Sequence, residues 1–184
     1  MKVLACLVLL CFVASVVYAD IVLKQGVVKP VLESASIGSY TEVEVNKRIK
    51  NITGGISLGL MTSKLSGRAN YWLSEQEIWQ EGDWATRGTL FVYPLLLNLK
   101  YNIGKFYLGG GGGMAFMDFS TKESKVKNRK MFQGILGYQI NKRLGLEVKR
   151  IFCDLDIESG VETYGIMEDR SNLNAWVGCL TWRW

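Results

Sequence analysis

Apolar and polar residues alternate at every second position along most of this chain. In the last ten residues, one parity carries large apolar side chains: Trp176, Leu180, Trp182 and Trp184. The other parity is more mixed: Val177, Cys179, Thr181 and Arg183. A period of two places these sets on opposite faces of a β-strand. The face with the tryptophans then points either into a soluble core or toward lipid in a transmembrane barrel.

The same period predicts eight strands, at 21–29, 35–45, 52–62, 88–101, 106–118, 131–140, 144–155 and 172–184. Many glycines (20), few prolines (2) and no sustained helical period also favour an all-β chain. Pro94 falls inside one strand and cannot donate a ladder hydrogen bond, so we expect a bulge there. Arg150 lies on the apolar parity of its strand. It must reach toward water, or a bulge shifts the register beside it.

The connections between these strands alternate between short and long. Tight turns are expected at 46–48, 102–105 and 141–143, and long loops at 63–86, 119–130 and 156–171. Short turns on one rim and long loops on the other are the organisation of a membrane barrel. The pattern therefore predicts an all-β, eight-stranded antiparallel up-and-down transmembrane β-barrel, with short periplasmic turns and longer extracellular loops. Its closure pairs 172–184 with 144–155 and with 21–29, the least regular strand.

The first residues have the composition of a secretory signal. Met1 and Lys2 precede an apolar run from Val3 to Val17, and Ala19 ends the segment. The run has the length of a signal h-region and is short for a helix that crosses a bilayer. We therefore expect a cleaved signal peptide at 1–19 and a barrel domain at 20–184.

Charged side chains occupy the parity opposite to the apolar face. The candidates for ion pairs inside the barrel are Glu42, Glu44, Lys100, Glu147, Lys149 and Arg183. A charge in a narrow lumen needs a partner, and these residues supply both signs. An eight-stranded barrel is just wide enough inside for side chains to fill it. We therefore expect a lumen plugged by side chains.

Two cysteines remain after removal of the signal, Cys153 and Cys179. Both lie on the inner parity of the last two strands, which are antiparallel neighbours. An oxidising periplasm would permit a disulfide between them, and two free thiols facing the lumen are the alternative. The chain has too few soft ligands for a metal site, and we expect no cofactor.

The connection at 63–86 is rich in acidic residues and tryptophan, with Trp72, Trp79 and Trp84. Ser74 and Glu77 fit a capping box, which predicts a short helix. Loops of this length are uncommon in compact domains unless they are functional or disordered. The connection is therefore a candidate contact surface facing outward, or else a loop packed over the barrel mouth without a partner.

Several segments give the chain a resemblance to a known group. They are Tyr93 to Tyr101, Lys105 to Gly111 and Leu136 to Glu147. On these segments the chain resembles the small eight-stranded outer-membrane β-barrel proteins of Gram-negative bacteria. The resemblance implies export to the outer membrane, with outer-membrane lipid as a partner.

The C-terminal aromatics extend this resemblance. Trp182-Arg183-Trp184 resembles the signal by which the barrel-assembly machinery recognises its clients, although Gly178 stands one residue earlier than the glycine of that pattern. The resemblance therefore implies the assembly machinery as a second partner. Together with Trp176, these tryptophans are expected at the membrane interface.

The chemistry of the chain argues against several functions. Histidine is absent, so the Ser-His or Cys-His site of lipid A-modifying barrels cannot be built. Glu42 and Glu44 could support a carboxylate-only hydrolysis, but ion pairing in the lumen is favoured. The formal net charge of +5 is too dispersed along the strands for nucleic-acid binding.

We therefore predict a non-enzymatic integral outer-membrane barrel with a role in envelope structure or surface interaction. A narrow porin-like channel is one alternative. The other is a soluble secreted β-barrel that binds a small apolar ligand, which would place the following residues inside: Leu95, Leu97, Trp182 and Trp184. The sequence names no extracellular partner.

Overall fold

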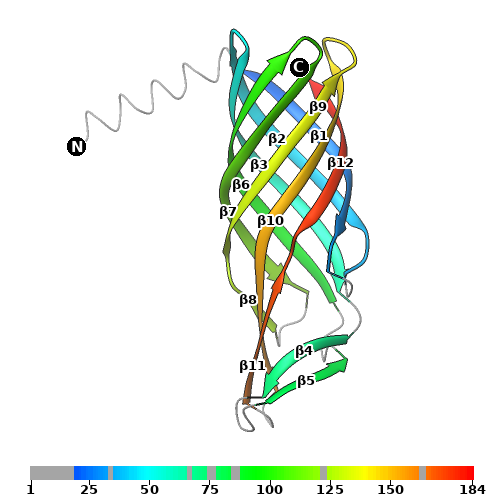
Figure 1. The fold of residues 1–184 in the computed structure, drawn as a ribbon, viewed down its shortest axis with the longest axis vertical. Helices are drawn as coiled ribbons and strands as arrows, with labels where there is room; N and C mark the ends of the chain where they lie inside the picture. Colours follow the sequence, from blue (N-terminus) through cyan, green and yellow to red (C-terminus); the bar gives the residue numbers. More distant parts are fainter. Residues whose placement is uncertain are drawn as a thin grey trace, which may run out of the picture.

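The computed structural model describes residues 19–32, 35–65, 68–73, 78–83, 88–120, 124–161 and 165–184. Their strands, shown in Figure 1, are β1 (Asp20–Pro30), β2 (Gly38–Ile49), β3 (Ile52–Leu65), β4 (Arg68–Leu73), β5 (Ile78–Asp83), β6 (Gly88–Ile103), β7 (Phe106–Phe119), β8 (Ser124–Val126), β9 (Arg129–Gln139), β10 (Leu144–Val161), β11 (Gly165–Asn172) and β12 (Ala175–Arg183). Within these ranges no helix has the length and apolarity that a membrane crossing requires.

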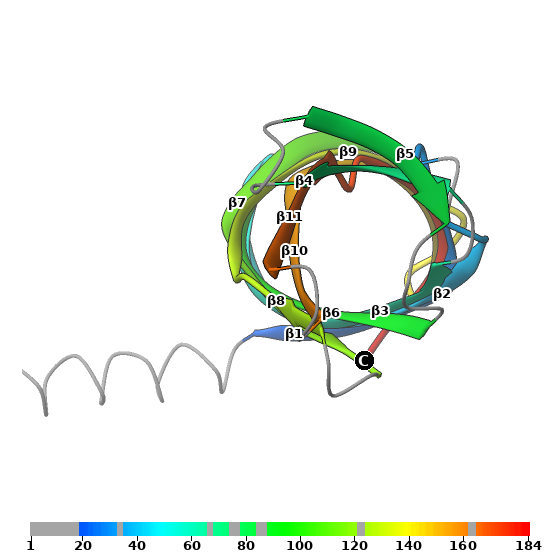
Figure 2. The ribbon, with the colours of Figure 1, turned by 90° about the horizontal axis from the view of Figure 1, so that it is seen from below.

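Eight of these strands form a closed antiparallel barrel, which Figure 2 shows along its axis. The neighbours follow the order β1-β2-β3-β6-β7-β9-β10-β12. β12 closes the ring because it pairs with β10 on one side and with β1 on the other. The ladder to β1 runs from Val22 opposite Arg183 to Pro30 opposite Ala175. The predicted fold class and the predicted pairing of the first and last strands are confirmed.

Strand pairing continues beyond the barrel at the end away from the short turns (Figure 1). There β10 pairs with β8 and β11, β11 with β4, and β4 with β5. The long connections were expected to be loops, and this is wrong for the segments that form β4, β5, β8 and β11. Short strands of mixed composition show no sustained apolar alternation, so their sequence does not reveal them. The helix expected at 74–77 lies outside the described residues.

Pro94 fits into β6 without the expected bulge. Leu58 pairs with Leu95, and Met61 with Val92, so the register between β3 and β6 is the same on both sides of Pro94. A Cβ atom on Gly59 would lie 3.0 Å from Cγ of Pro94. The absent side chain of Gly59 therefore leaves room for the proline ring, and the ladder is interrupted without an inserted residue.

The two faces of the wall have opposite chemistry. On β6, Leu97 and Leu99 point outward and are 65% and 63% exposed, whereas Asn98 and Lys100 point inward and are 5% and 6% exposed. The inward side chains differ along the axis. Near the short turns they are mainly polar and charged, and toward the other end they form an apolar cluster that includes Leu90, Phe119, Leu155 and Leu173.

The closing seam between β1 and β12 should be sensitive to added volume at Gly26. A Cβ atom there would lie 2.0 Å from the carbonyl oxygen of Gly178 and 2.6 Å from Cα of Cys179. Because both are backbone atoms, Gly26→Ala should push the two strands apart and cost about 1–3 kcal/mol of unfolding free energy. Urea unfolding followed by tryptophan fluorescence measures this loss.

Gly54→Ala is the matched control, since no atom lies within 4 Å of its Cβ position. Equal stability of the two variants would contradict this account of the seam.

Candidate functional site

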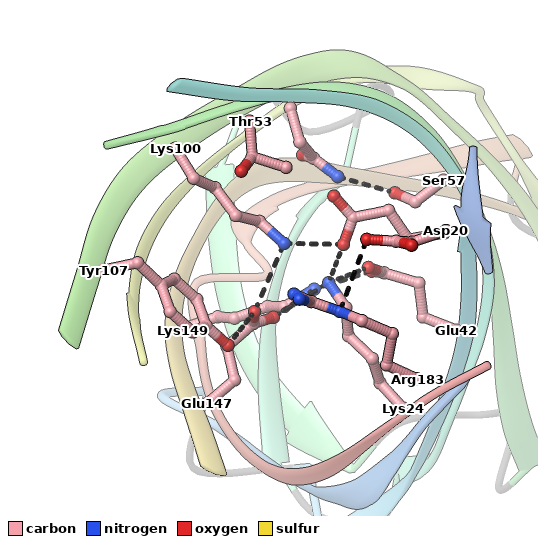
Figure 3. Close-up of polar contacts among 12 residues, drawn as sticks. Asp20, Lys24, Glu42, Thr53, Ser57, Lys100, Tyr107, Glu147, Lys149 and Arg183 are labelled. Atoms are coloured by element: carbon pink, nitrogen blue, oxygen red, sulfur yellow. Dashed lines mark hydrogen bonds and ion pairs between the residues drawn. The ribbon is translucent and has the colours of Figure 1, made fainter. Parts of the chain in front are cut away.

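A cluster of charged side chains from four strands of the barrel meets inside the lumen (Figure 3). We call it the lumen cluster, and its members are Lys24, Glu42, Glu44, Lys100, Glu147 and Lys149. Each member sits on the inward parity of β1, β2, β6 or β10. Their side chains are 0% exposed, apart from Lys100 at 7%.

Lys24 lies at the centre of the lumen cluster. Its Nζ is 2.6 Å from Oε1 of Glu42, 2.5 Å from Oε2 of Glu44 and 2.9 Å from Oε1 of Glu147. Glu42 and Glu44 belong to β2, the neighbour of β1, whereas Glu147 belongs to β10. Lys24 therefore connects three carboxylates from two strands, and it is the residue that holds the cluster together.

The other two lysines complete the charge balance. Lys149 Nζ lies 2.6 Å from Glu42 and 3.3 Å from Glu147. Lys100 Nζ lies 2.6 Å from Glu44 and 3.4 Å from Glu147. Three ammonium groups thus face three carboxylates, and the cluster is neutral as a whole. Such compensation is what permits charges to remain ionised where burial removes them from bulk water.

Two tyrosines supply hydrogen bonds to the same carboxylates. Tyr40 donates its hydroxyl proton to Glu42 and accepts a bond of 2.8 Å from Lys149. Tyr107 donates to Oε2 of Glu147 over 2.9 Å. Its ring occupies the space beside Gly137, where a Cβ atom would lie 2.0 Å from the ring. The glycine therefore lets Tyr107 lie flat against the wall and reach Glu147.

The run of five glycines in β7 makes room for the inner polar side chains. A Cβ atom on Gly109 would lie 3.0 Å from Cγ of Lys100, and one on Gly111 would lie 2.1 Å from Oδ1 of Asn98. Asn98 donates to Ser57 over 3.0 Å and accepts from Gln133 over 2.7 Å. A second polar network therefore lies in the space that the glycines leave open.

Arg183 is not part of the lumen cluster. Its Nε is 3.8 Å from Asp20, and both side chains are partly exposed at the short-turn mouth. A small cavity of about 20 Å³ lies at this mouth, lined by residues that include Arg143, Arg183, Asn102 and Tyr107. The space is enough for about one water molecule.

The disulfide considered between Cys153 and Cys179 is wrong, because both cysteines are free and buried. Cys179 lies opposite Glu147 on β10. Cys153 stands six residues farther along β10, which is about 20 Å in an extended strand. A disulfide requires Cα atoms less than about 7 Å apart. Parity placed both thiols on the inner face, but it did not give their positions along the axis.

The predicted aromatic residues lie on the outer wall or beyond it. Trp176, Trp182 and Trp184 face outward from β12 and its end, and they are 52%, 44% and 66% exposed. Trp72 in β4 and Trp79 in β5 are cross-strand partners in the pairing beyond the barrel. Trp84 lies outside the described residues.

Sequence reasoning missed Lys24, Tyr40 and Tyr107. Lys24 gave a usable signal, because it is the charged residue between Val22 and Gly26 on the inward parity of the first strand. Tyr40 and Tyr107 gave no such signal, since a tyrosine on the inward parity is equally consistent with simple packing of the core. Among the described residues, no group of three or more His, Cys, Asp or Glu has an arrangement that could hold a metal ion.

Comparison with known proteins places the fold. No family model matches the sequence, and no curated protein matches it. Among solved structures, the chain is similar to the outer membrane protein OprG from Pseudomonas aeruginosa, with a TM-score of 0.53 and 12% identity over 90% of this chain and 96% of that chain. The fold is that of an outer-membrane β-barrel. The outer membrane protein AlkL, studied in lipid bilayers, gives a TM-score of 0.43 at 12% identity over 90% of each chain.

Removing Lys24 alone should destabilise this barrel strongly. Lys24→Met leaves three buried carboxylates facing two lysines, and breaking a buried ion pair from one side costs about 3–5 kcal/mol. In Lys24→Met/Glu147→Met the pairs Lys100–Glu44 and Lys149–Glu42 remain, each at 2.6 Å. The double variant should therefore lose less stability than the sum of the two single variants.

Urea unfolding of Lys24→Met, Glu147→Met and the double variant in detergent micelles measures this coupling. Lys64→Met serves as the control, because Lys64 is exposed on the outer face of β3. Additive losses would show that the lumen cluster does not act as a unit.

Proposed function

We propose that this protein is a non-enzymatic integral outer-membrane barrel that acts in envelope structure or surface interaction, exported by the signal at 1–19. One observation carries the proposal, namely the distribution of polarity across the wall. Charged side chains are buried inside, whereas leucine, valine and tryptophan cover the outside. A wall of this kind is stable where the surrounding solvent is lipid.

The exposure of particular side chains disfavours the soluble alternative. A soluble barrel that binds an apolar ligand needs Leu95, Leu97 and Trp182 inside. They point outward and are 44%, 65% and 44% exposed. A soluble chain with this surface would present an apolar patch far larger than monomers in water tolerate.

We also propose that the lumen is closed by its own side chains. The lumen cluster bridges β1, β2, β6 and β10, and an apolar cluster fills the interior beyond it. Opening a pore would separate ammonium from carboxylate groups that are 2.5–3.4 Å apart. This cost supports a closed barrel over the narrow channel.

The chemistry of the lumen cluster supports a non-enzymatic role. Each of its three carboxylates is held by at least two lysines at 2.5–3.4 Å. General acid–base catalysis needs a group whose proton is free to move near the operating pH, and such pairing opposes this. The strands β4, β5 and β11 beyond the barrel are the proposed surface for contacts outside the cell.

The outer-membrane proposal is tested by fractionation of cells that express the full chain. The protein should appear in the outer-membrane fraction, require detergent for extraction and migrate differently on a gel before and after boiling. These properties follow from a closed, lipid-facing barrel that detergent alone does not unfold. A chain that stays soluble without detergent would refute the proposal.

The same fractionation tests the role of the C-terminal tryptophans in assembly. We propose that Trp182 and Trp184 are read by the barrel-assembly machinery, so Trp182→Ser/Trp184→Ser should lower the amount of the heat-modifiable form. Phe116→Ser, which removes an outward-facing aromatic side chain from β7, is the control. Equal amounts of folded protein in all three would contradict the assembly role.

The closed lumen is tested by single-channel recording in planar bilayers. The wild-type protein should give no discrete conductance steps at any ionic strength, because a lumen closed by the lumen cluster would hold no continuous column of water. A porin reconstituted in the same membrane shows that insertion is detectable. Reproducible steps from the pure protein would overturn the closed lumen and favour the narrow channel.

A further inference from the structure

Two basic residues and a tryptophan form a row across three neighbouring strands on the outer wall. Lys29 of β1 pairs with Trp176 of β12, and Trp176 pairs with Arg150 of β10. Figure 1 shows these strands side by side. All three side chains are on the outward parity, so two cations flank one aromatic ring on the outer wall.

Arg150 is placed there by regular pairing and not by a bulge. The ladders from β10 to β9 and to β12 keep one register through Arg150. Its guanidinium carbon lies 4.9 Å from the ring centroid of Trp176 and 5.7 Å from that of Phe152. This stacking lets the side chain lie along the wall as a half-buried cation–π pair.

The charge of Arg150 has no carboxylate partner among the residues that the structure describes. Its Nη1 is buried against the rings and makes no hydrogen bond. Asp154, the next acidic residue on the outward parity of β10, stands four residues away with Phe152 between them. Lys29 is exposed and likewise forms no ion pair with a described residue.

The row lies toward the end of the barrel away from the short turns. Lys29 is the residue before the end of β1, and Trp176 is the second residue of β12. In the proposed orientation this end faces outward, so the row lies in the outer leaflet, where tryptophan marks the interface. Unpaired cations at that depth attract anionic lipid groups.

The outward position next to Trp176 on β12, on the side of the short turns, is a glycine, Gly178. Val27, Gly178 and Val148 form the next outward row across the same strands. A Cβ atom on Gly178 would have no neighbour within 4 Å, whereas Val27 and Val148 are 59% and 47% exposed. Gly178 therefore leaves a gap between the two valines, which we call the groove. It is one residue long on β12, because Leu180, 55% exposed, occupies the next outward position. The groove accommodates one segment of an acyl chain.

We propose that Arg150 and Lys29 bind the phosphate group of an anionic outer-leaflet lipid, with Trp176 between them and one acyl chain over Gly178. This inference rests on the proposed function, since it requires a barrel inserted in a membrane. The guanidinium and ammonium groups donate hydrogen bonds to the phosphate oxygens, and the groove holds the chain below. The site therefore combines two cations for the phosphate group with an apolar surface for the acyl chain.

Native mass spectrometry of the full chain in detergent tests the site. The probes are phosphatidic acid and phosphatidylcholine with identical acyl chains. The wild type should retain phosphatidic acid in preference to phosphatidylcholine. Each of Arg150→Gln and Lys29→Gln should reduce that preference about fivefold, because each removes one of the two cations that attract the phosphate group. Lys64→Gln, which removes an exposed cation from the outer face of β3, should leave the preference unchanged.

Two more measurements distinguish a bound lipid from a bound phosphate ion. Excess inorganic phosphate should not displace the bound lipid, and Gly178→Leu should weaken retention because it fills the groove. Displacement by free phosphate would overturn the lipid assignment. Since Lys29 is exposed, Lys29→Gln gives the same test if Arg150→Gln does not fold.

The two proposals fail in different ways. If the wild type inserts into membranes but Arg150→Gln, Lys29→Gln and Lys64→Gln retain phosphatidic acid equally, the lipid site is wrong and the outer-membrane barrel stands. If the wild type does not insert at all, both are wrong.

Discussion

Three ammonium and three carboxylate groups share the interior of this barrel, and their mutual distances of 2.5–3.4 Å set the conditions for the rest of the structure. A single charge in such a place would be too costly, so each member needs the others. Because Lys24 comes from β1 and Glu147 from β10, the network also joins strands from the two ends of the chain. The ion pairs therefore reinforce the closure that the backbone ladder makes between β1 and β12.

Space for this network comes from residues without side chains. Glycine at Gly109, Gly111 and Gly137 lets Lys100, the Asn98 network and Tyr107 lie close to the wall. Small and large side chains thus face each other across the lumen, as dense packing inside a narrow barrel requires. Toward the other end, where the inward side chains are apolar, packing replaces ion pairing.

The residues of the outer wall are subject to a different constraint, set by what surrounds the barrel. In the proposed membrane setting, the hydrocarbon core of the bilayer neither pairs with a charge nor hydrogen-bonds a backbone group, and this accounts for the complete ring of ladders and for the leucine, valine and aromatic surface. Arg150 departs from this rule, and its stacking on Trp176 and Phe152 shows how the wall accommodates its charge.

Local alternation by itself determined the number of barrel strands, their order and the face of nearly every side chain, because the direction of a side chain in a strand depends only on parity. The alternation also gave the charged composition of the lumen, with Glu42, Glu44, Lys100, Glu147 and Lys149. Only the tertiary structure decided how deep each residue sits. That depth depends on register and closure, which separate Cys153 from Cys179, bring Lys24 to the centre of the cluster and leave Arg183 at the mouth.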